Sequence, residues 1–291
     1  MGLFLFVGML WGIPYLLIRV AVTQVAPPVI VFSRVIIGAF ILLPLALKNK
    51  IFTELSGKWK YVFGYAVGEM VIPWILISQA EKNLPSGLAG LLVATVPIFS
   101  SIFASIDGDK SVWHHKRLFG MIIGFIGMAL VIGIESFKGN ISLLSVSEII
   151  IGAIGYAWAT ALVTKHMPKV DGISINAAAL FITALVYLPL FIWKFPVHSL
   201  RLTVISSLIA LGIFPTAAAF VLYFILMREV GPARGSLVTY LNTSFAVILG
   251  IIFLKEKLTL GIIIGLPLVL IGSYLAGRKE KIIEPAPLME R

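Results

Sequence analysis

The stretch SQAEKNLPSGLAGLLVATVPIFSSIFASIDGDK at residues 78–110 and the stretch ILMREVGPARGSLVTYLNTSFAVILGIIFLKEK at residues 225–257 decide the fold of this chain. A shift of 147 residues lays one over the other, with Pro85 on Pro232 and Asp109 on Glu256. The same shift places Trp11 on Trp158. Similarity at one fixed offset is the signature of an internal repeat. The chain is therefore expected to contain two copies of one structural unit.

The composition of the 291-residue chain is that of a membrane protein. Hydrophobic residues make up 59% and charged residues 12%, with a mean hydropathy of +1.05, whereas soluble domains carry roughly 45–50% apolar and about 25% charged residues. This balance excludes a soluble globular domain. The absence of cysteine excludes disulfides and thiolate-ligated zinc. The net charge of +10 is spread through short loops, which argues against a nucleic-acid partner.

Apolar runs long enough to cross a bilayer recur along the whole chain. A transmembrane helix needs about 20 mostly apolar residues. Ten such runs are expected, at residues 2–19, 28–47, 61–80, 86–106, 118–134, 147–165, 173–193, 202–227, 233–254 and 258–276. The predicted fold class is an all-α polytopic membrane protein with ten transmembrane helices in a lipid bilayer.

The repeat divides these spans into two units of five. We predict a first five-helix repeat at residues 1–135, a second at residues 146–277 and a polar cytoplasmic tail at residues 278–291. Because five is an odd number, the second unit must enter the membrane upside down. Inverted repeats are the architecture of many secondary transporters, whose substrate site lies between the repeats near the midplane.

Lysine and arginine in the loops predict the orientation. One side of the membrane holds 15 of the 23 basic residues and the other holds 7, while Arg34 lies inside a span. Cytoplasmic loops carry the excess of these residues. With ten spans both termini share the richer side, so both are expected in the cytoplasm, with the chain in the plasma (inner) membrane.

Four features of the repeat stand out: Trp11-Gly12 in the first span, Trp158-Ala159 in the sixth, the paired fourth and ninth spans, and GPARGSLVTYLNTSFAVILGIIFLKEKLT at residues 231–259. These segments resemble the EamA family of the drug/metabolite transporter superfamily. The resemblance implies a ten-helix inverted-repeat bundle with a central cavity, like the ten-span amino-acid exporters of the YddG type. Family members move amino acids, purines, other small metabolites or drugs. This chain departs from the family pattern at Ser244, where proline is common and where the first half keeps Pro97.

Glu69 is the one acidic residue well inside a predicted span. At about 100° per residue, Tyr61, Tyr65 and Gln79 fall within the same arc of about 80°. An ionised carboxylate in hydrocarbon costs roughly 2.5 kcal/mol or more, so it normally faces a cavity or a partner. Two interpretations stay open. Either this stripe lines a cavity, where Glu69 binds a cationic amine or a proton, or Glu69 is a paired or protonated carboxyl that fixes helix packing.

Arg34 is the one basic residue deep in a span. It lies about 9–10 Å from the outer surface and Glu69 about 13 Å from the inner one, so their levels differ by about 7 Å in a core of about 30 Å. Arg34 is a candidate for binding a substrate carboxylate through two parallel hydrogen bonds. The alternatives are a structural pair with Glu69 or a side chain that extends to the outer interface.

Aromatic residues are further candidates for the lining of a cavity. They are Trp11, Trp158, Tyr240 and Trp74. The alternative is the aromatic belt at the membrane interfaces. Asn242 points away from Tyr240 on an ideal helix and is expected to form an interhelical hydrogen bond instead.

Glycine pairs indicate close helix packing. Gly120 with Gly124, Gly261 with Gly265, and Gly64 with Gly68 each form GxxxG, which lets helix backbones approach. The first two pairs are repeat mates, so the fifth and tenth spans are expected to pack against each other or against a second protomer in a dimer.

The favoured function is a secondary transporter or facilitator that exports amino acids by alternating access, with a small molecule as partner, no cofactor and no bound metal. Proton coupling is left open. Drugs or nucleosides and purines are alternative substrates. A membrane enzyme with Asp107 and Asp109 as metal ligands, and a passive receptor bundle, are alternatives of other classes. The chain contains no P-loop, HExxH or GxSxG motif, so it is not expected to be an enzyme.

Overall fold

The computed structural model describes residues 2–48, 51–108, 113–137, 142–230 and 238–277. All regular elements in these ranges are helical. They are α1 (Gly2–Ala21), α2 (Pro27–Lys48), α3 (Ile51–Glu54), α4 (Trp59–Ala66), η1 (Val67–Val71), α5 (Ile72–Ala80), α6 (Ser86–Val93), α7 (Val96–Ile106), α8 (His115–Phe137), α9 (Leu143–His166), α10 (Gly172–Lys194), α11 (Leu202–Gly212), η3 (Ile213–Ala218), α12 (Ala219–Val230), α14 (Val238–Leu254) and α15 (Leu260–Gly277). The two η elements are π-helices.

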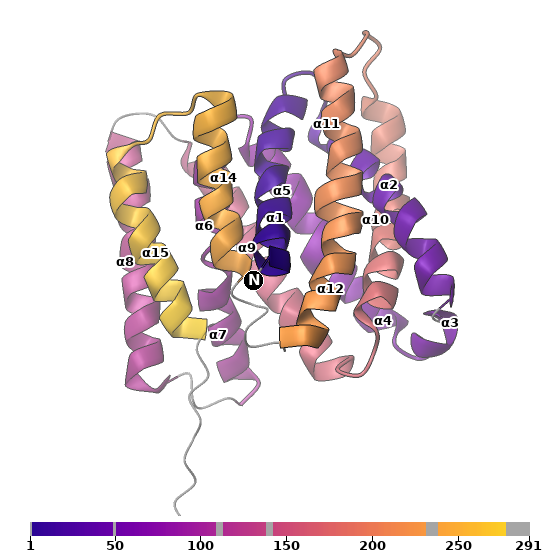
Figure 1. Cartoon of the computed structure of the whole chain (residues 1–291), viewed down its shortest axis with the longest axis horizontal. Coiled ribbons are helices and arrows are strands. Elements are labelled where there is room, and N and C mark those ends of the chain that lie inside the picture. Colours follow the sequence, from indigo (N-terminus) through magenta and orange to yellow (C-terminus); the bar gives the residue numbers. More distant parts are fainter. Residues whose placement is uncertain (1, 49–50, 109–112, 138–141, 231–237, 278–291) are drawn as a thin grey trace, which may run out of the picture.

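The helices form one bundle in which neighbours in space are mostly distant in sequence (Figure 1). At one edge α8 packs along α15, and at the other α2 packs along α10. Between them α1 packs on α14 and α11, while α9 packs on α5 and α7. The centre of the bundle is therefore built from helices of both halves of the chain.

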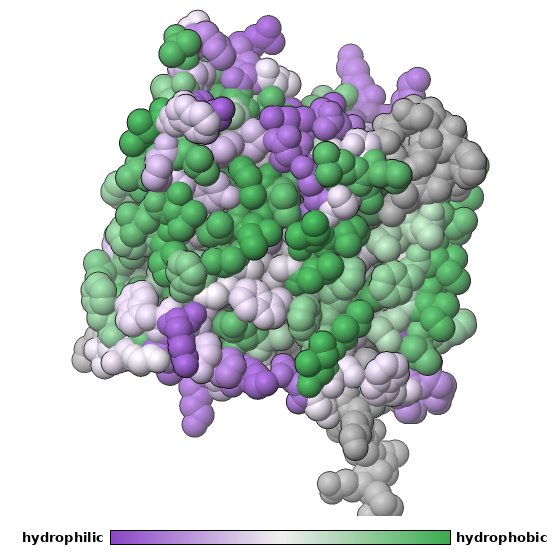
Figure 2. Space-filling view, turned by 180° about the vertical axis from the view of Figure 1, so that it is seen from behind, coloured by the Kyte–Doolittle hydropathy of each residue, from purple (hydrophilic) through white to green (hydrophobic). Residues whose placement is uncertain are grey.

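The surface of the bundle is that of a membrane-spanning protein. Within the described residues, seven helical segments are long and apolar enough to cross a membrane, and two shorter apolar helices follow, Leu241–Leu254 and Leu260–Leu275. Large apolar side chains face outward, among them Phe40 at 74% exposure and Phe253 at 64%. On the face seen in Figure 2, hydrophobic residues form a band across the middle of the bundle, with hydrophilic residues above and below it. An outer apolar band of this extent matches hydrocarbon rather than water.

The two ends of the bundle differ in packing. We call the end where α1 and α5 finish and α2 and α6 begin the closed end. There Ile18, Val29 and Leu84 belong to one buried apolar cluster that joins α1, α2 and α6 with α11 and α14. We call the opposite end, where α9 finishes and α10 begins, the open end.

The two π-helices interrupt long helices beside prolines. Pro215 lies inside η3 and has no N–H, so the carbonyl of Leu211, four residues earlier, loses its helical donor. The hydroxyl of Thr216 donates to that carbonyl at 2.7 Å. In the first half, the hydroxyl of Tyr187 on α10 donates to the Val71 carbonyl at the end of η1, also at 2.7 Å. Side chains therefore bind backbone groups at both interruptions.

Glycines set the closest helix contacts. A Cβ on Gly272 of α15 would lie 2.7 Å from the Gly120 carbonyl oxygen of α8 and nearer still to the Gly124 backbone. The expected packing of these two spans against each other is present, although Gly272 makes the approach from α15. On Gly68 a Cβ would lie 2.6 Å from the ring of Trp158 on α9.

We predict that Gly272→Ala destabilises the protein by about 1–3 kcal/mol, because the added methyl group must push apart two backbones that cannot yield like a side chain. The measurement is the midpoint of thermal unfolding in detergent. The matched control is Gly2→Ala, where a Cβ meets nothing within 4 Å. Equal midpoints for the two variants would contradict the α8–α15 contact.

Candidate functional site

A cavity of about 350 Å³ lies in the middle of the bundle. Helices of both halves contribute to its wall: α1, α2, α4, η1, α5, α6 and α7 from the first, and α9, α10, α12 and α14 from the second. Its polar and aromatic lining residues are Trp11, Tyr15, Arg34, Tyr65, Glu69, Trp74, Tyr156, Thr160, Thr164, Asn176, Phe220, Tyr223, Phe224, Thr239 and Asn242. The site is thus composite, and neither half of the chain encloses it alone.

The cavity extends to one end of the bundle only. Its wall includes Thr164 in the last turn of α9 and Gly172, the first residue of α10, so it reaches the open end. Toward the other end the wall finishes at Ile18 and Ile77, which belong to the apolar cluster at the closed end. A solute therefore has a route from the open end and meets packed side chains at the closed end.

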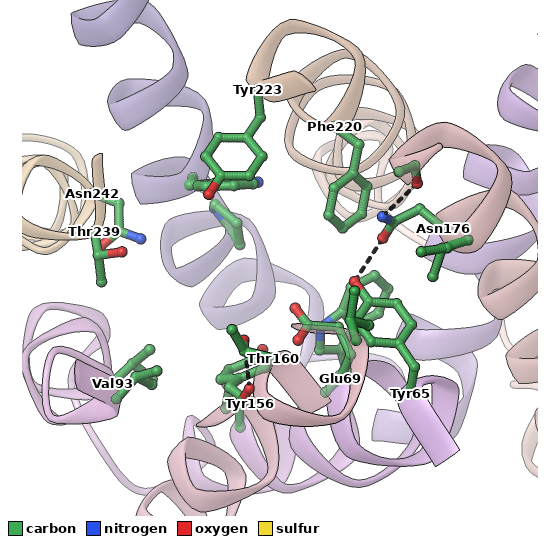
Figure 3. A pocket seen from close by; sticks show the side chains of 18 of the residues that line it. Tyr65, Glu69, Val93, Tyr156, Thr160, Asn176, Phe220, Tyr223, Thr239 and Asn242 are labelled. Atoms are coloured by element: carbon green, nitrogen blue, oxygen red, sulfur yellow. Dashed lines mark hydrogen bonds between the residues drawn. The ribbon is translucent and has the colours of Figure 1, made fainter. Parts of the chain in front are cut away.

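The carboxylate of Glu69 faces the interior of this cavity. Glu69 lies in η1, is half-buried, and points toward the middle of the cavity near Tyr156 and Phe220 (Figure 3). Among the described residues it has no hydrogen-bond partner and no basic group within 4.0 Å. A carboxylate at this depth without a protein partner is available to a ligand.

The guanidinium of Arg34 is held in place by two contacts. Its Nε donates to Thr216 Oγ1 at 2.7 Å, and its Cζ lies 3.6 Å from the centroid of the Trp74 ring. Arg34 is only 8% exposed, yet it lines the cavity. Stacking on the Trp74 ring and the hydrogen bond at Nε fix the plane of the guanidinium group. Its terminal N–H donors are then suited to binding a carboxylate.

Arg34 and Glu69 share the cavity without forming an ion pair in the described structure. No nitrogen of Arg34 lies within 4.0 Å of a Glu69 oxygen, although the two groups are close enough to interact electrostatically. The sequence left a structural pair as one alternative. The geometry instead shows a basic and an acidic group that face the same space.

Aromatic side chains give the remaining wall its shape. Trp11 lies against Tyr223 and Phe220, with ring centroids 4.6 Å and 6.2 Å apart. The hydroxyl of Tyr65 donates to Asn176 Oδ1 at 3.0 Å, and Asn176 Nδ2 donates to the Gly172 carbonyl at 2.9 Å (Figure 3). This wall offers ring faces with a few fixed polar atoms, which is the usual make-up of a small-molecule site.

The structure brings together most of the residues that the sequence selected. Glu69, Arg34, Tyr65, Trp11 and Trp74 all line the cavity. The side chain of Tyr240 falls outside the described residues, although its backbone lies in α14.

Gln79 and Trp158 are not among the cavity-lining residues. The π turn at η1 adds a residue to the helix and rotates the residues after it by up to about 100°, so Ile77 rather than Gln79 shares the face of Glu69. Trp158 packs instead against Gly68 of η1 and is 38% exposed. Ideal helical geometry does not foresee either displacement.

Several lining residues were not selected from the sequence. Asn242 was expected to point away from the cavity but lies in its wall, 9% exposed. Asn176, Tyr156 and Tyr223 were not singled out at all. The available signal was a polar or tyrosine side chain in the middle of an apolar span, which is uncommon unless it meets a cavity or a partner.

The metal site of the enzyme hypothesis is not found among the described residues. Asp107 Oδ1 lies 2.5 Å from Lys165 Nζ at the open end, and Asp109 falls outside the described ranges. No group of three or more His, Asp or Glu side chains in those ranges is arranged to hold a metal ion.

A family model matches both halves of the chain. It is the model of the EamA-like transporter family, and it matches residues 1–133 and 143–278.

Curated relatives match almost the full length. An uncharacterized transporter named YvbV from Bacillus subtilis (strain 168) is 26% identical over 278 residues, with 95% of this chain and 90% of the relative covered. An uncharacterized inner membrane transporter named YedA from Escherichia coli (strain K12) is 26% identical over 300 residues, covering 97% and 92%. A crystal structure shares the fold with a TM-score of 0.68 at 18% identity, covering 94% of this chain and 95% of that one.

We predict that Thr216→Val destabilises the protein by roughly 1–3 kcal/mol, because the isosteric change removes the acceptor of the buried Arg34 Nε and the donor to the Leu211 carbonyl. Thermal unfolding in detergent measures the effect. Thr160→Val is the control, since that hydroxyl is exposed and binds only the carbonyl of its own helix at Tyr156. A Thr216→Val protein as stable as this control would show that the hydroxyl does not hold Arg34.

Proposed function

This chain belongs to the EamA-like transporter family and is a multi-pass membrane transporter, and from this premise we propose that it carries amphiphilic amino acids out of the cell. The observation that supports this most is the pairing of an unpartnered carboxylate with a positioned guanidinium in one cavity. Glu69 would bind the substrate ammonium group and Arg34 its carboxylate. The aromatic wall would take an apolar side chain.

The chemistry of the cavity favours a zwitterion over a single charge. Because Glu69 and Arg34 both face the cavity without a direct ion pair, a ligand with one charge would leave the opposite residue unbalanced in a region of low dielectric. An amino acid supplies both charges within a few ångströms. The volume of about 350 Å³ lies at the small end of ligand pockets, which suits a single amino acid with bound water.

We propose the ten-span inverted-repeat architecture, with units 1–135 and 146–277, as the basis of transport. In support of it, the shift of 147 residues maps η1 onto η3 and α2 onto α10. It also maps the α1–α14 contact onto the α9–α7 contact, and both exist. Two halves related in this way can rock against each other around a fixed cavity, which is alternating access.

We further propose that the open end faces the cytoplasm. The loops at this end carry the larger share of lysine and arginine, and the positive-inside rule assigns such loops to the cytoplasm. Both termini, including the polar tail at residues 278–291, would then be cytoplasmic in the inner membrane. In this arrangement the structure represents an inward-facing conformation that loads an export substrate from the cell.

Nucleobases and aromatic drugs are a second substrate class to be included in the transport assay. The rings of Trp11, Tyr223 and Phe220, which meet at tilted and edge-on angles, offer flat faces on which a nucleobase or an aromatic drug would also pack. These ligands lack the ammonium group that Glu69 would bind. Their flux would therefore be insensitive to removal of the Glu69 charge.

We predict that Glu69→Gln lowers the transport rate of a labelled amino acid in proteoliposomes by about tenfold or more, because the amide keeps the shape of the side chain but cannot neutralise an ammonium group.

Arg34→Lys should raise the KM for the same amino acid, since a lysine ammonium group lacks the planar guanidinium needed for bidentate binding of a carboxylate. The assay is uptake from a panel of labelled amino acids, nucleosides and purines, with and without an imposed pH gradient.

Glu229→Gln is the matched control, because Glu229 is exposed and lies outside the cavity lining. It should transport like the parent protein. Full amino-acid flux in Glu69→Gln would contradict the role of Glu69, and saturable flux of nucleosides or purines alone would replace the proposed substrate class.

Orientation is measurable because the chain has no cysteine, so one introduced thiol is a unique label site. Thr23 and Thr164 are exposed at the closed and the open end respectively. We predict that a membrane-impermeant maleimide added to intact cells labels Thr23→Cys and spares Thr164→Cys until the cells are made permeable. The reverse pattern would invert the proposed orientation.

A further inference from the structure

A second carboxyl group is buried at the closed end, outside the cavity. Glu81 follows α5 directly, four residues beyond the cavity residue Ile77, which is about 6 Å along the helix axis. It is 0% exposed. Neither of its carboxyl oxygens has a hydrogen-bond partner. A buried polar group without a partner is rare in native proteins and calls for an explanation.

The neighbouring cation does not pair with this carboxyl. Arg19 at the end of α1 donates its Nη1 hydrogen to the backbone carbonyl of Glu81 rather than to the side chain. No nitrogen of Arg19 or Arg34 lies within 4.0 Å of the Glu81 carboxyl in the described structure. The backbone contact holds α1 against the end of α5 and leaves the carboxyl of Glu81 uncompensated by a direct ion pair.

The neighbouring acidic residue, Glu256, already accepts hydrogen bonds from α6. Glu256, which follows α14, accepts hydrogen bonds from the backbone N–H groups of Ser86 and Gly87 at 2.7 Å and 3.0 Å. A carboxylate at the N-terminus of α6 complements the helix dipole. Lys255, with φ of 55°, turns the chain so that Glu256 reaches α6. The closed end therefore places a second negative charge near Glu81 instead of a partner.

An ionised Glu81 would be costly in this position. An unpaired charge in a dry protein interior loses several kcal/mol of hydration, and such groups normally change protonation state instead. A neutral carboxyl needs no counter-charge, and its burial costs far less. We propose that Glu81 is a proton-binding site whose carboxyl takes up a proton from the outer solution when the closed end forms and returns it when that end opens.

The direction of the pH effect follows from the surroundings of Glu81. Burial raises the pKa of Glu81 well above its usual range; Arg19 and Arg34 lower it, and the Glu256 carboxylate raises it. A hydrated Glu81 in an opened end would have an ordinary pKa near 4.3. The closed conformation thus binds the proton more tightly, so protons stabilise it. Closure is favoured as the outer pH falls and is lost as the pH rises through the pKa of the closed state.

Proton binding itself is independent of any substrate, whereas its link to opening rests on the proposed alternating access. A proton taken up at closure would add to the proposed transport cycle, because an acidic outer solution would then drive the protein back to the inward-facing state. It also assigns the site to Glu81 at the end of α5 and not to the cavity residue Glu69.

Infrared difference spectroscopy of the full chain in liposomes tests the proton directly. At about pH 7 we expect the Glu81→Gln difference spectrum to show the loss of a protonated-carboxyl C=O band. The exposed control Glu229→Gln should leave this C=O band unchanged. If Glu81→Gln fails to fold, Glu81→Asp should shift the same C=O band rather than remove it. Loss or shift of a carboxylate band at Glu81 would overturn the proposal.

A single thiol tests the link to the closed end. Leu84 is fully buried there and is absent from the cavity lining. The quantity to compare is the rate at which an impermeant maleimide modifies Leu84→Cys, divided by its rate for the exposed Thr23→Cys at the same pH. This ratio should be about tenfold or more higher at about pH 8 than at about pH 6. Adding Glu81→Gln should abolish this dependence. A pH-independent ratio in the parent background would overturn the coupling, and no result here depends on finding a transported substrate.

Discussion

The cost of charge in hydrocarbon is the constraint on which the rest of this structure depends. A carboxylate and a guanidinium at mid-depth are tolerated only where something other than lipid surrounds them. The bundle meets this demand by placing Glu69 and Arg34 on the wall of a shared cavity built from both halves. Arg34 is positioned by Thr216 and Trp74, whereas Glu69 forms no hydrogen bond or ion pair with a described residue. This asymmetry suits Glu69 to binding the ammonium group of a ligand.

The helix interruptions serve the same site. η1 carries Glu69, which lines the cavity, and η3 carries Thr216, the hydrogen-bond partner of the lining residue Arg34. π turns frequently occur at functional sites because they change which side chains face a neighbour. At the closed end, the Glu256 cap on α6 and the Arg19 contact to the end of α5 join segments from different parts of the chain.

The sequence predicted the membrane class and the two charged residues of the cavity, because charges inside apolar spans stand out. Glu69 and Arg34 were found for that reason, and Trp11, Tyr65 and Trp74 followed from their position in spans. Which side chains of a span face the cavity was less predictable. A π turn moves Gln79 off the face of Glu69, and the ring of Trp158 packs against Gly68 instead. Glu81 was missed because it falls one residue past the end of a span, where an acid normally meets water. Only tertiary packing, which includes the Arg19 contact from α1, makes it a buried group.

Recognition of a zwitterion by Arg34 and Glu69 is tested most directly by truncating the ligand rather than by mutating the protein. Binding of phenylalanine, phenylalaninamide and 3-phenylpropanoate to the purified transporter should be compared by titration calorimetry. Phenylalanine is expected to bind at least about tenfold more tightly than either analogue, because each analogue leaves Arg34 or Glu69 without its counter-charge. Equal affinity for all three compounds would show that the two charged residues do not recognise a zwitterion.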